Sequence, residues 1–166
     1  MPYTLEQLSD DIRKQLKADS GPAGKEAVAS LVSKVLRDEE FVAKHLTAEQ
    51  CRPRKVLYED PELGFCICGH VYETAANGAP HDHGSSWAIY GVAKGDTEMT
   101  DWRIVGKADN GASLVEKATT YMMKPGDSHV YDVGAVHSPN RAGPTKLVRI
   151  EGKNLDHVQR SHIKAA

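Results

Sequence analysis

Three histidines in two short segments are the residues of this chain whose types and spacing suit chemistry. His81 and His83 lie two apart in Pro80-His-Asp-His-Gly-Ser-Ser-Trp87, and His137 ends the segment Gly134-Ala-Val-His137. Side chains alternate between the two faces of a β-strand, so a strand here would point His81 and His83 the same way. Two imidazoles from one strand and a third from a neighbouring strand would hold a metal by three nitrogens. Open positions would remain for a substrate or dioxygen.

The spacing of His81 and His83 also fits a polar loop with two incidental histidines. The segment that favours a metal site is Pro125-Gly-Asp-Ser-His-Val-Tyr-Asp-Val-Gly-Ala-Val-His137, whose glycine turns flank a strand-like run. This pattern predicts a hairpin that brings His137 to the start of a strand. His129, eight residues earlier, is a reserve ligand if that register is wrong. Imidazole suits iron, nickel, copper and zinc, so the ligands by themselves do not choose the metal.

The length, charge and cysteine content of the chain exclude several classes of function. A chain of 166 residues is most simply one domain over 1–166, and a net charge of −2 with a pI near 6.4 gives no footprint for nucleic acid or an anionic membrane. No apolar run reaches membrane-spanning length, and the first residues do not resemble a secretory signal. Three cysteines are too few for a disulfide framework. We therefore expect a cytoplasmic protein with reduced thiols that binds neither nucleic acid nor a membrane.

The hydrophobic pattern changes its period near residue 52. Residues 1–50 carry apolar positions three and four apart, with Thr4 placed to cap the first helix, so this segment is predicted to be helical. Residues 53–156 contain many short β-like runs between turn residues, which is typical of a closed or sandwiched all-β body. Residues 157–166 read as a C-terminal tail. The expected fold class is mainly β, with an N-terminal helical segment on a jelly-roll barrel.

The two histidine segments resemble the motifs of the cupins. In that family the first motif has His-x-His followed by Glu and then Gly, and the second has Gly, a later Pro, Gly and His. The positions that fit are His81, His83 and Gly95 in the first motif, and Gly126, Gly134 and His137 in the second. Asp132 stands where the second motif usually has proline, and the glutamate position falls on Ala88, or on Trp87 if it is counted one residue shorter. Neither side chain can bind a metal. The resemblance therefore implies a metal site of three histidines without a carboxylate.

Within the cupins, a three-histidine site behind a helical segment looks like the cysteine dioxygenase-like thiol dioxygenases. The stretch Pro80–Trp87 is similar to that family's His-Asp-His segment, and the similarity extends over roughly residues 5–156. The resemblance implies Fe(II), with zinc, nickel or manganese as the other metals that such a site takes. It also implies a small thiol-bearing acid and dioxygen as substrates. Cupins often pair through sheet edges, so a homodimer is allowed, although no residue pattern here argues for one.

The chain departs from the thiol dioxygenases outside the metal ligands. Ala88 stands where the animal enzymes carry a cysteine cross-linked to a tyrosine. Leu147, Arg149 and Glu151 occupy the slots of the Ser-His-Tyr relay. The arginine that binds the substrate carboxylate falls near Lys55, so Lys55 or its neighbour Arg54 is expected to meet a carboxylate. These changes leave the substrate open.

Arg149 and Glu151 lie two apart on a predicted strand and therefore share a face. If this face points into the barrel, Arg149 would hold an anionic substrate, and Glu151 would act as a base or orient Arg149. If it points outward, the two form an exterior ion pair. With Lys55, they are the predicted catalytic residues.

Four other side chains are expected to have packing roles. We expect Trp87 to share the ligand face and Tyr90 to point away from it, with core packing as the main role of both. Cys66 and Cys68 are expected to be small buried hydrophobes.

Three functions follow as hypotheses. The first is a non-heme Fe(II) dioxygenase acting on a small thiol acid. The second is a three-histidine dioxygenase for a β-diketone or another non-thiol substrate. The third is a cupin that is not an oxygenase: an isomerase, or a module that binds or senses small molecules with zinc or nickel.

Overall fold

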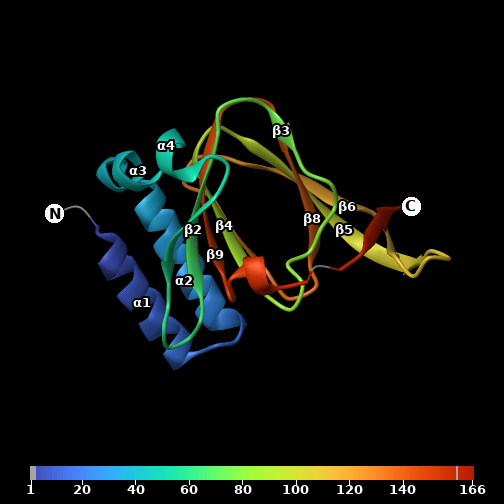
Figure 1. Cartoon of the computed structure of the whole chain (residues 1–166), viewed down its shortest axis with the longest axis horizontal. Helices are drawn as coiled ribbons and strands as arrows, with labels where there is room; N and C mark the ends of the chain where they lie inside the picture. Colours follow the sequence, from blue (N-terminus) through green and yellow to red (C-terminus); the bar gives the residue numbers. More distant parts are fainter. Residues whose placement is uncertain (1–2, 160) are drawn as a thin grey trace.

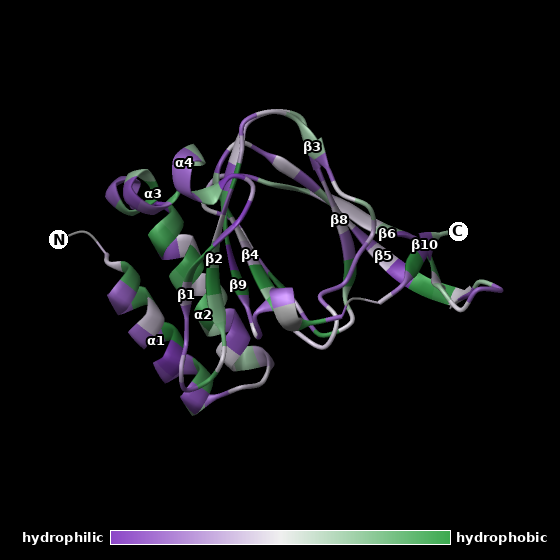
Figure 2. Cartoon of the chain, in the orientation of Figure 1, coloured by the Kyte–Doolittle hydropathy of each residue, from purple (hydrophilic) through white to green (hydrophobic). Residues whose placement is uncertain are grey.

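The N-terminal third of the protein is helical. The computed structural model describes residues 3–159 and 161–166. Its helices here are α1 (Leu5–Ala18), α2 (Pro22–Leu36), α3 (Glu39–His45) and α4 (Ala48–Cys51). Thr4 caps α1 as predicted: its hydroxyl accepts from the Gln7 amide, and the Gln7 side chain accepts from the Thr4 amide. Hydrophilic and hydrophobic residues both appear on α1 in Figure 2, and its apolar side buries Leu8 and Ile12. The predicted helical segment is confirmed.

The described residues of the rest of the chain form two five-stranded sheets. The order in the first sheet is β1 (Lys55–Glu59), β2 (Cys66–Tyr72), β9 (Thr145–Glu151), β4 (Ala88–Lys94) and β7 (Ser128–Tyr131). The order in the second is β10 (Ile163–Ala165), β6 (Ser113–Met123), β5 (Thr97–Lys107), β8 (Val136–Arg141) and β3 (Ala76–Asn77). The strand pairs are antiparallel except β10 with β6, which is parallel.

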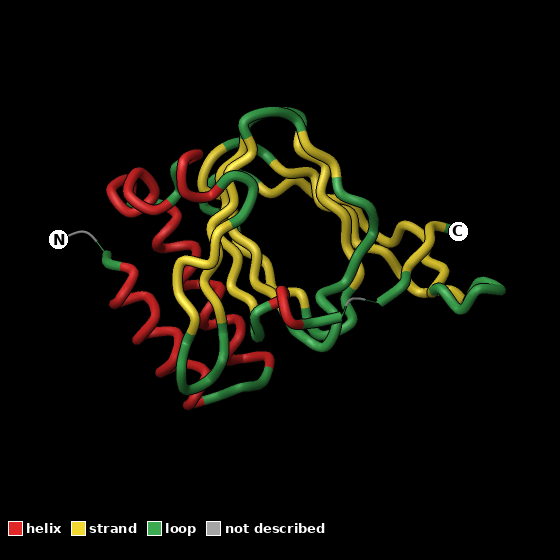
Figure 3. The backbone as a smooth tube through the Cα atoms, in the orientation of Figure 1, coloured by secondary structure: helices red, strands yellow, loops and turns green. Residues whose placement is uncertain are grey.

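The two sheets face one another and curl around a common interior (Figure 3). Along the chain, successive strands repeatedly cross from one sheet to the other, for example from β6 to β7, from β7 to β8 and from β8 to β9. This alternation of strands between two facing sheets is the double-stranded β-helix of the cupin jelly roll. The predicted fold class, a mainly β jelly roll with an N-terminal helical segment, is confirmed.

The helices cover the outer face of the first sheet (Figure 1). Val148 and Ile150 of β9 belong to the same buried cluster as the apolar residues of the helices. Gly91 of β4 allows a close approach, because a Cβ there would lie 2.6 Å from Val32 Cγ1 of α2. Since alternate residues of β9 face opposite sides, Arg149 and Glu151 point into the barrel.

The C-terminal segment is more ordered than the predicted tail. Leu155–His157 form a short 3-10 helix, and β10 pairs with β6 through Ile163 and Ser113. Together with β5 and β6, β10 extends beyond the barrel on the side away from the helices (Figure 2). Among the described residues, no helix combines the length and the apolar character needed to cross a membrane.

Candidate metal centre

His81 and His83 come from a loop that leads into β4, not from a regular strand. His81 forms an isolated antiparallel bridge with His137, and each backbone amide donates to the other residue's carbonyl at 3.0 Å. After His83 the chain turns at Gly84, whose φ of +62° suits glycine. The strand predicted through both histidines is therefore wrong. The backbone bridge to His137 supplies the convergence that strand alternation was expected to supply.

The three imidazoles meet inside the barrel. One ligand nitrogen from each of His81, His83 and His137 can be chosen so that all lie within 4.8 Å of one another. The Nε2 atoms of His83 and His137 are 3.2 Å apart. His83 and His137 are buried and His81 is partly exposed, so the cluster has one accessible side. The group contains no carboxylate, in line with the alanine at position 88.

The surroundings favour neutral imidazoles that can act as ligands. Nδ1 of His81 lies 2.8 Å from the carbonyl oxygen of Ala79. A carbonyl only accepts, so Nδ1 carries the proton and the Nε2 lone pair is left for a metal. Burial lowers the pKa of His137 far below its usual value, and the neighbouring His81 and His83 lower it further. This donor set fits a divalent transition metal held by three nitrogens.

A cavity of about 460 Å3 adjoins the cluster at His81. Its other lining residues are Pro53, Arg54, His70, Tyr72, Ala76, Asn77, Gly78, Ala79, Pro80, Pro139, Arg141 and Arg149. They include three arginines and no carboxylate. Arg141 was not predicted, although its even spacing from His137 on β8 places both on one face of the strand. The cavity therefore joins a metal-ligand cluster to a wall of positive charge.

Arg149 and Glu151 lie inside the barrel, as one of the two predicted orientations required. Both are buried, and Arg149 Nη1 is 3.5 Å from Glu151 Oε1. Glu151 Oε2 also accepts from Arg54 Nη2 at 3.0 Å. Glu151 thus orients two of the three arginines of the cavity. The exterior ion pair, which was the alternative, is wrong, and the catalytic roles of Arg149 and Glu151 stay predictions.

Lys55 lies on the exposed side of the chain at the start of β1 and does not line the cavity. Its neighbour Arg54 does, because successive residues in extended backbone point in opposite directions. Arg54 also forms an ion pair with Asp156 at 3.0 Å. The catalytic role predicted for Lys55 stays a prediction, and Arg54 is the residue that the fold brings to the cavity beside His81.

Trp87 and Tyr90 point opposite to their predicted directions. Trp87 packs with the buried cluster of the helices, and Lys25 Nζ lies 5.7 Å from its ring centroid. Tyr90 is buried in the barrel interior, where its hydroxyl accepts from Arg141. The prediction counted strand alternation from His83, but β4 begins only at Ala88. The intervening turn changes the phase.

The remaining candidates have packing roles. Cys66 and Cys68 are free and buried, and burial raises the pKa of Cys66 to about 11, as expected for a small apolar side chain. His129 is not a member of the ligand group, and its ring lies 4.5 Å from that of Tyr131. Tyr131 itself stacks on His137, a contact that the sequence pattern did not reveal.

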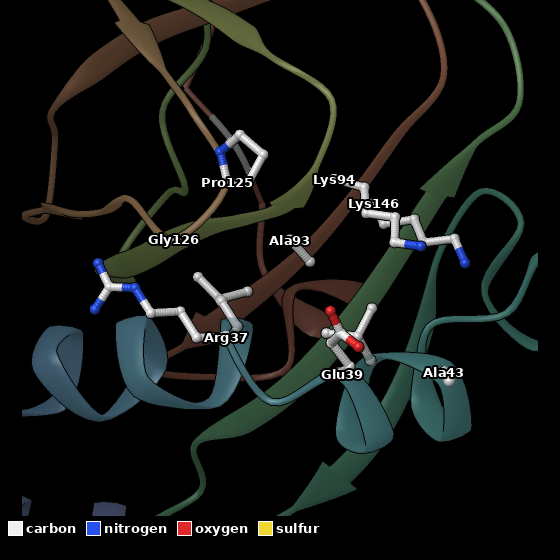
Figure 4. A pocket seen from close by; sticks show the side chains of 10 residues that line it. Arg37, Glu39, Ala43, Ala93, Lys94, Pro125, Gly126 and Lys146 are labelled. Carbon is white, nitrogen blue, oxygen red and sulfur yellow. The ribbon is translucent and has the colours of Figure 1, made fainter.

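A second cavity of about 690 Å3 lies outside the barrel, between the helices and the first sheet. Figure 4 shows Lys94 and Lys146 on one side of it and Glu39 and Ala43 of α3 on the other. Glu39 is the acidic residue among its lining side chains, and no histidine or cysteine is among the described residues that line it.

No protein-family model matches this sequence, and no curated protein sequence matches it. Solved structures of the same fold class do match. A Klebsiella pneumoniae protein with a double-stranded β-helix domain is 17% identical, with 69% of this chain and 86% of that chain covered and a TM-score of 0.48. KdgF from Halomonas sp. is 20% identical over 63% and 83% of the two chains, with a TM-score of 0.45.

The cupin domain of Cnp3 from Schizosaccharomyces pombe is 14% identical, with a TM-score of 0.46. The match covers 61% of this chain and 64% of that one, just under two thirds of the yeast domain. All three scores lie below 0.5, so the fold assignment rests on the strand order of the two sheets, and the function must be argued from the site.

Proposed function

We propose that this protein is a non-heme Fe(II) dioxygenase of the three-histidine cupin type that acts on a small thiol-bearing acid, in the manner of the cysteine dioxygenase-like enzymes. The observation that carries the proposal is the junction of two features in one cavity. His81, His83 and His137 offer three nitrogens to a metal, and Arg54, Arg141 and Arg149 line the adjoining wall. Such a wall suits the carboxylate of an acid substrate.

The ligand set supports a metal with open coordination positions. Three neutral imidazoles without a carboxylate leave the metal's charge uncompensated, which favours an anionic substrate group such as a thiolate beside it. Bound ferrous iron would supply the redox chemistry needed to activate dioxygen. The sequence resemblance to the thiol dioxygenases points to the same metal.

The residues of the chain bind and orient the substrate in this proposal. The arginine wall holds the substrate carboxylate, and Glu151 keeps the guanidinium groups of Arg54 and Arg149 in place. Burial of Arg141 and Arg149 removes competing water, which strengthens their hold on an anion. The substrate thiol is thereby directed toward the three histidines.

The other two hypotheses require different properties of the arginines that line the cavity. A β-diketone has no carboxylate to meet Arg141 and Arg149, so the arginines favour an acid over a diketone. A zinc or nickel cupin without oxygenase activity would use the same histidines, and metal content together with activity distinguishes it.

The experiment is to purify the protein, measure bound metal and follow oxygen uptake with cysteine, 3-mercaptopropionate, mercaptosuccinate and acetylacetone. The proposal expects iron, uptake with a thiol acid and a sulfinate product. Stoichiometric zinc without uptake for any compound would contradict it and favour the binding module. Uptake with acetylacetone alone would favour the diketone enzyme. The His83→Ala variant should lose both metal and uptake.

A further inference from the structure

Two buried arginines share one tyrosine on the wall of the metal-side cavity. Arg141 and Arg149 are 3% and 7% exposed. Their Cζ atoms lie 5.8 and 5.4 Å from the ring centroid of Tyr90. Arg141 Nη2 donates to the Tyr90 hydroxyl, and the Nε atoms of both arginines have no hydrogen-bond partner among the described residues. Two guanidinium groups that line the same cavity therefore lie beside one tyrosine, and each has a buried Nε without a partner in the described part of the chain.

The protein itself compensates little of this positive charge. Arg149 has Glu151 at 3.5 Å, but Glu151 is shared with Arg54, which also pairs with Asp156. Within the described part of the chain, no carboxylate forms an ion pair with Arg141. A buried charge without a counter-charge is costly. A ligand anion is the group that would remove this cost.

Burial and the excess of positive charge both lower the pKa of His70, whose imidazole lies on the same wall of the cavity. Burial lowers the pKa of His70 well below its usual value, and the charges of Arg149, Arg54 and Arg141 lower it further. No acidic side chain is among the residues that line the cavity. The positive field thus belongs to the cavity as a whole and not to a single arginine.

Building on the oxygenase function proposed above, we propose that the substrate is a small dicarboxylic thiol, with one acid group for Arg141 and the other for Arg149. Each guanidinium offers a fork of donors that matches a carboxylate. A substrate with one carboxylate would pair with only one of the two buried arginines, and the other would keep only its protein partner: Tyr90 for Arg141, or the shared Glu151 for Arg149. The thiol would be the group that reaches the three histidines.

The first test measures whether the arginine pair binds two carboxylates, and it does not depend on oxygenase activity. Binding of succinate and of butyrate to the full-length protein as purified is measured by calorimetry, since the two acids differ by one carboxylate. Succinate is expected to bind roughly tenfold more tightly or better, because it adds a charge-assisted pair. Equal affinities would overturn the proposal.

Variants of Arg141 test whether this residue causes the preference for succinate over butyrate. Arg141→Gln should reduce the affinity for succinate to that for butyrate, while Arg103→Gln, which changes an exposed arginine of β5, should keep the preference. If Arg141→Gln does not fold, Arg141→Lys is used, and its preference should fall because lysine lacks the planar fork. A preference for succinate that is unchanged in both Arg141 variants would overturn the assignment.

The second test compares oxygen uptake with mercaptosuccinate and with 3-mercaptopropionate. The dicarboxylic thiol should have the higher kcat/KM, and Arg141→Gln should remove this advantage. An equal or higher kcat/KM for 3-mercaptopropionate would overturn the dicarboxylate proposal and leave the oxygenase function standing. Absence of uptake with both thiols, while succinate still binds preferentially, would contradict the oxygenase function and support the two-acid cavity.

Discussion

The phenol ring of Tyr131 stacks on the imidazole of His137, with 4.0 Å between the ring centroids. Tyr131 lies on β7 of the first sheet and His137 on β8 of the second, so the stack joins the two sheets at the metal ligands. The Tyr131 hydroxyl lies 2.5 Å from that of Tyr121, which donates to Asp101 at 3.0 Å. Asp101 lies opposite His137 in the strand pair of β5 and β8. The stack therefore restricts the orientation of the His137 ring, which is the third candidate ligand.

Loss of this stack should weaken metal binding. We expect Tyr131→Leu to lower the metal affinity by roughly tenfold, since aromatic pairs contribute about 0.5–1.5 kcal/mol and the freed imidazole loses its fixed orientation. Tyr131→Phe keeps the ring and should bind metal as the parent does. Competition with a chromophoric chelator measures both. Equal losses in the two variants would show that the hydroxyl, and not the stack, positions His137.

Removal of a ligand should abolish metal binding. The variants His81→Ala, His83→Ala and His137→Ala are each expected to lose stoichiometric metal, because two imidazoles remain where three are needed. His129→Ala is the matched control, since His129 lies in the barrel wall outside the ligand group. Metal analysis after dialysis checks this. Stoichiometric metal in His137→Ala would contradict the assignment of the third ligand.

The ion pair of Arg54 with Glu151 should stabilise the fold. Arg54→Met leaves the fully buried Glu151 with only the longer contact to Arg149, and we expect the free energy of unfolding to fall by about 2–4 kcal/mol. Arg103→Met breaks an exposed pair with Glu116 and should cost less than about 1 kcal/mol. Urea unfolding of both variants measures the difference. Equal losses would mean that burial of Glu151 does not decide the cost.

Asp60 should make stability depend on pH. Burial by itself would raise the pKa of Asp60, but hydrogen bonds from Arg13, the Leu63 amide and Tyr58 outweigh it, so the net pKa is lowered. A carboxyl whose pKa is lower in the folded state stabilises the protein above its unfolded pKa of about 3.9. That stability is lost as the pH falls through the lower folded pKa.

Asp60→Asn tests this dependence. The variant should be less stable than the parent at pH 7, and the two unfolding free energies should converge as the pH falls below about 4. Urea unfolding at a series of pH values measures the convergence. A constant difference down to pH 2 would contradict the lowered pKa of Asp60.

The contact between α2 and the first sheet depends on Gly91. A methyl group there would lie 2.6 Å from Val32 and 2.7 Å from Leu36, so Gly91→Ala should destabilise the protein by about 1–3 kcal/mol. Gly106→Ala on β5 has no heavy atom within 4 Å of the added group and should be close to neutral. Thermal unfolding compares the two. An unchanged Tm in Gly91→Ala would show that the helices adjust their distance from the sheet.

Local patterns were sufficient for much of the fold. The apolar period of the first 50 residues and the capping residue Thr4 predict helices, because helix formation depends on nearby residues. The short runs between glycine and proline turns predict strands for the same reason. Pairing of the last residues with β6 is a contact between distant segments, and the C-terminal strand was therefore read as a tail.

The site prediction failed where it depended on which face of a strand each side chain occupies. Arg149 and Glu151 were correctly placed on one face, but only the packing of Val148 and Ile150 against the helices decided that this face points inward. Tyr90 was assigned to the wrong side because the turn after His83 resets the alternation. A local sequence does not reveal such a change of phase.

The sequence by itself determined the chemical types at the site: three histidines, no carboxylate at position 88, Arg149 with Glu151 on a later strand, and a basic residue near position 55. Only the tertiary structure decided which of them meet. Arg54 and not Lys55 lines the cavity, and Arg141 and Arg149 share Tyr90. The physical reason is that side-chain alternation is a local property, whereas convergence in a barrel depends on the register between strands that are far apart in the chain.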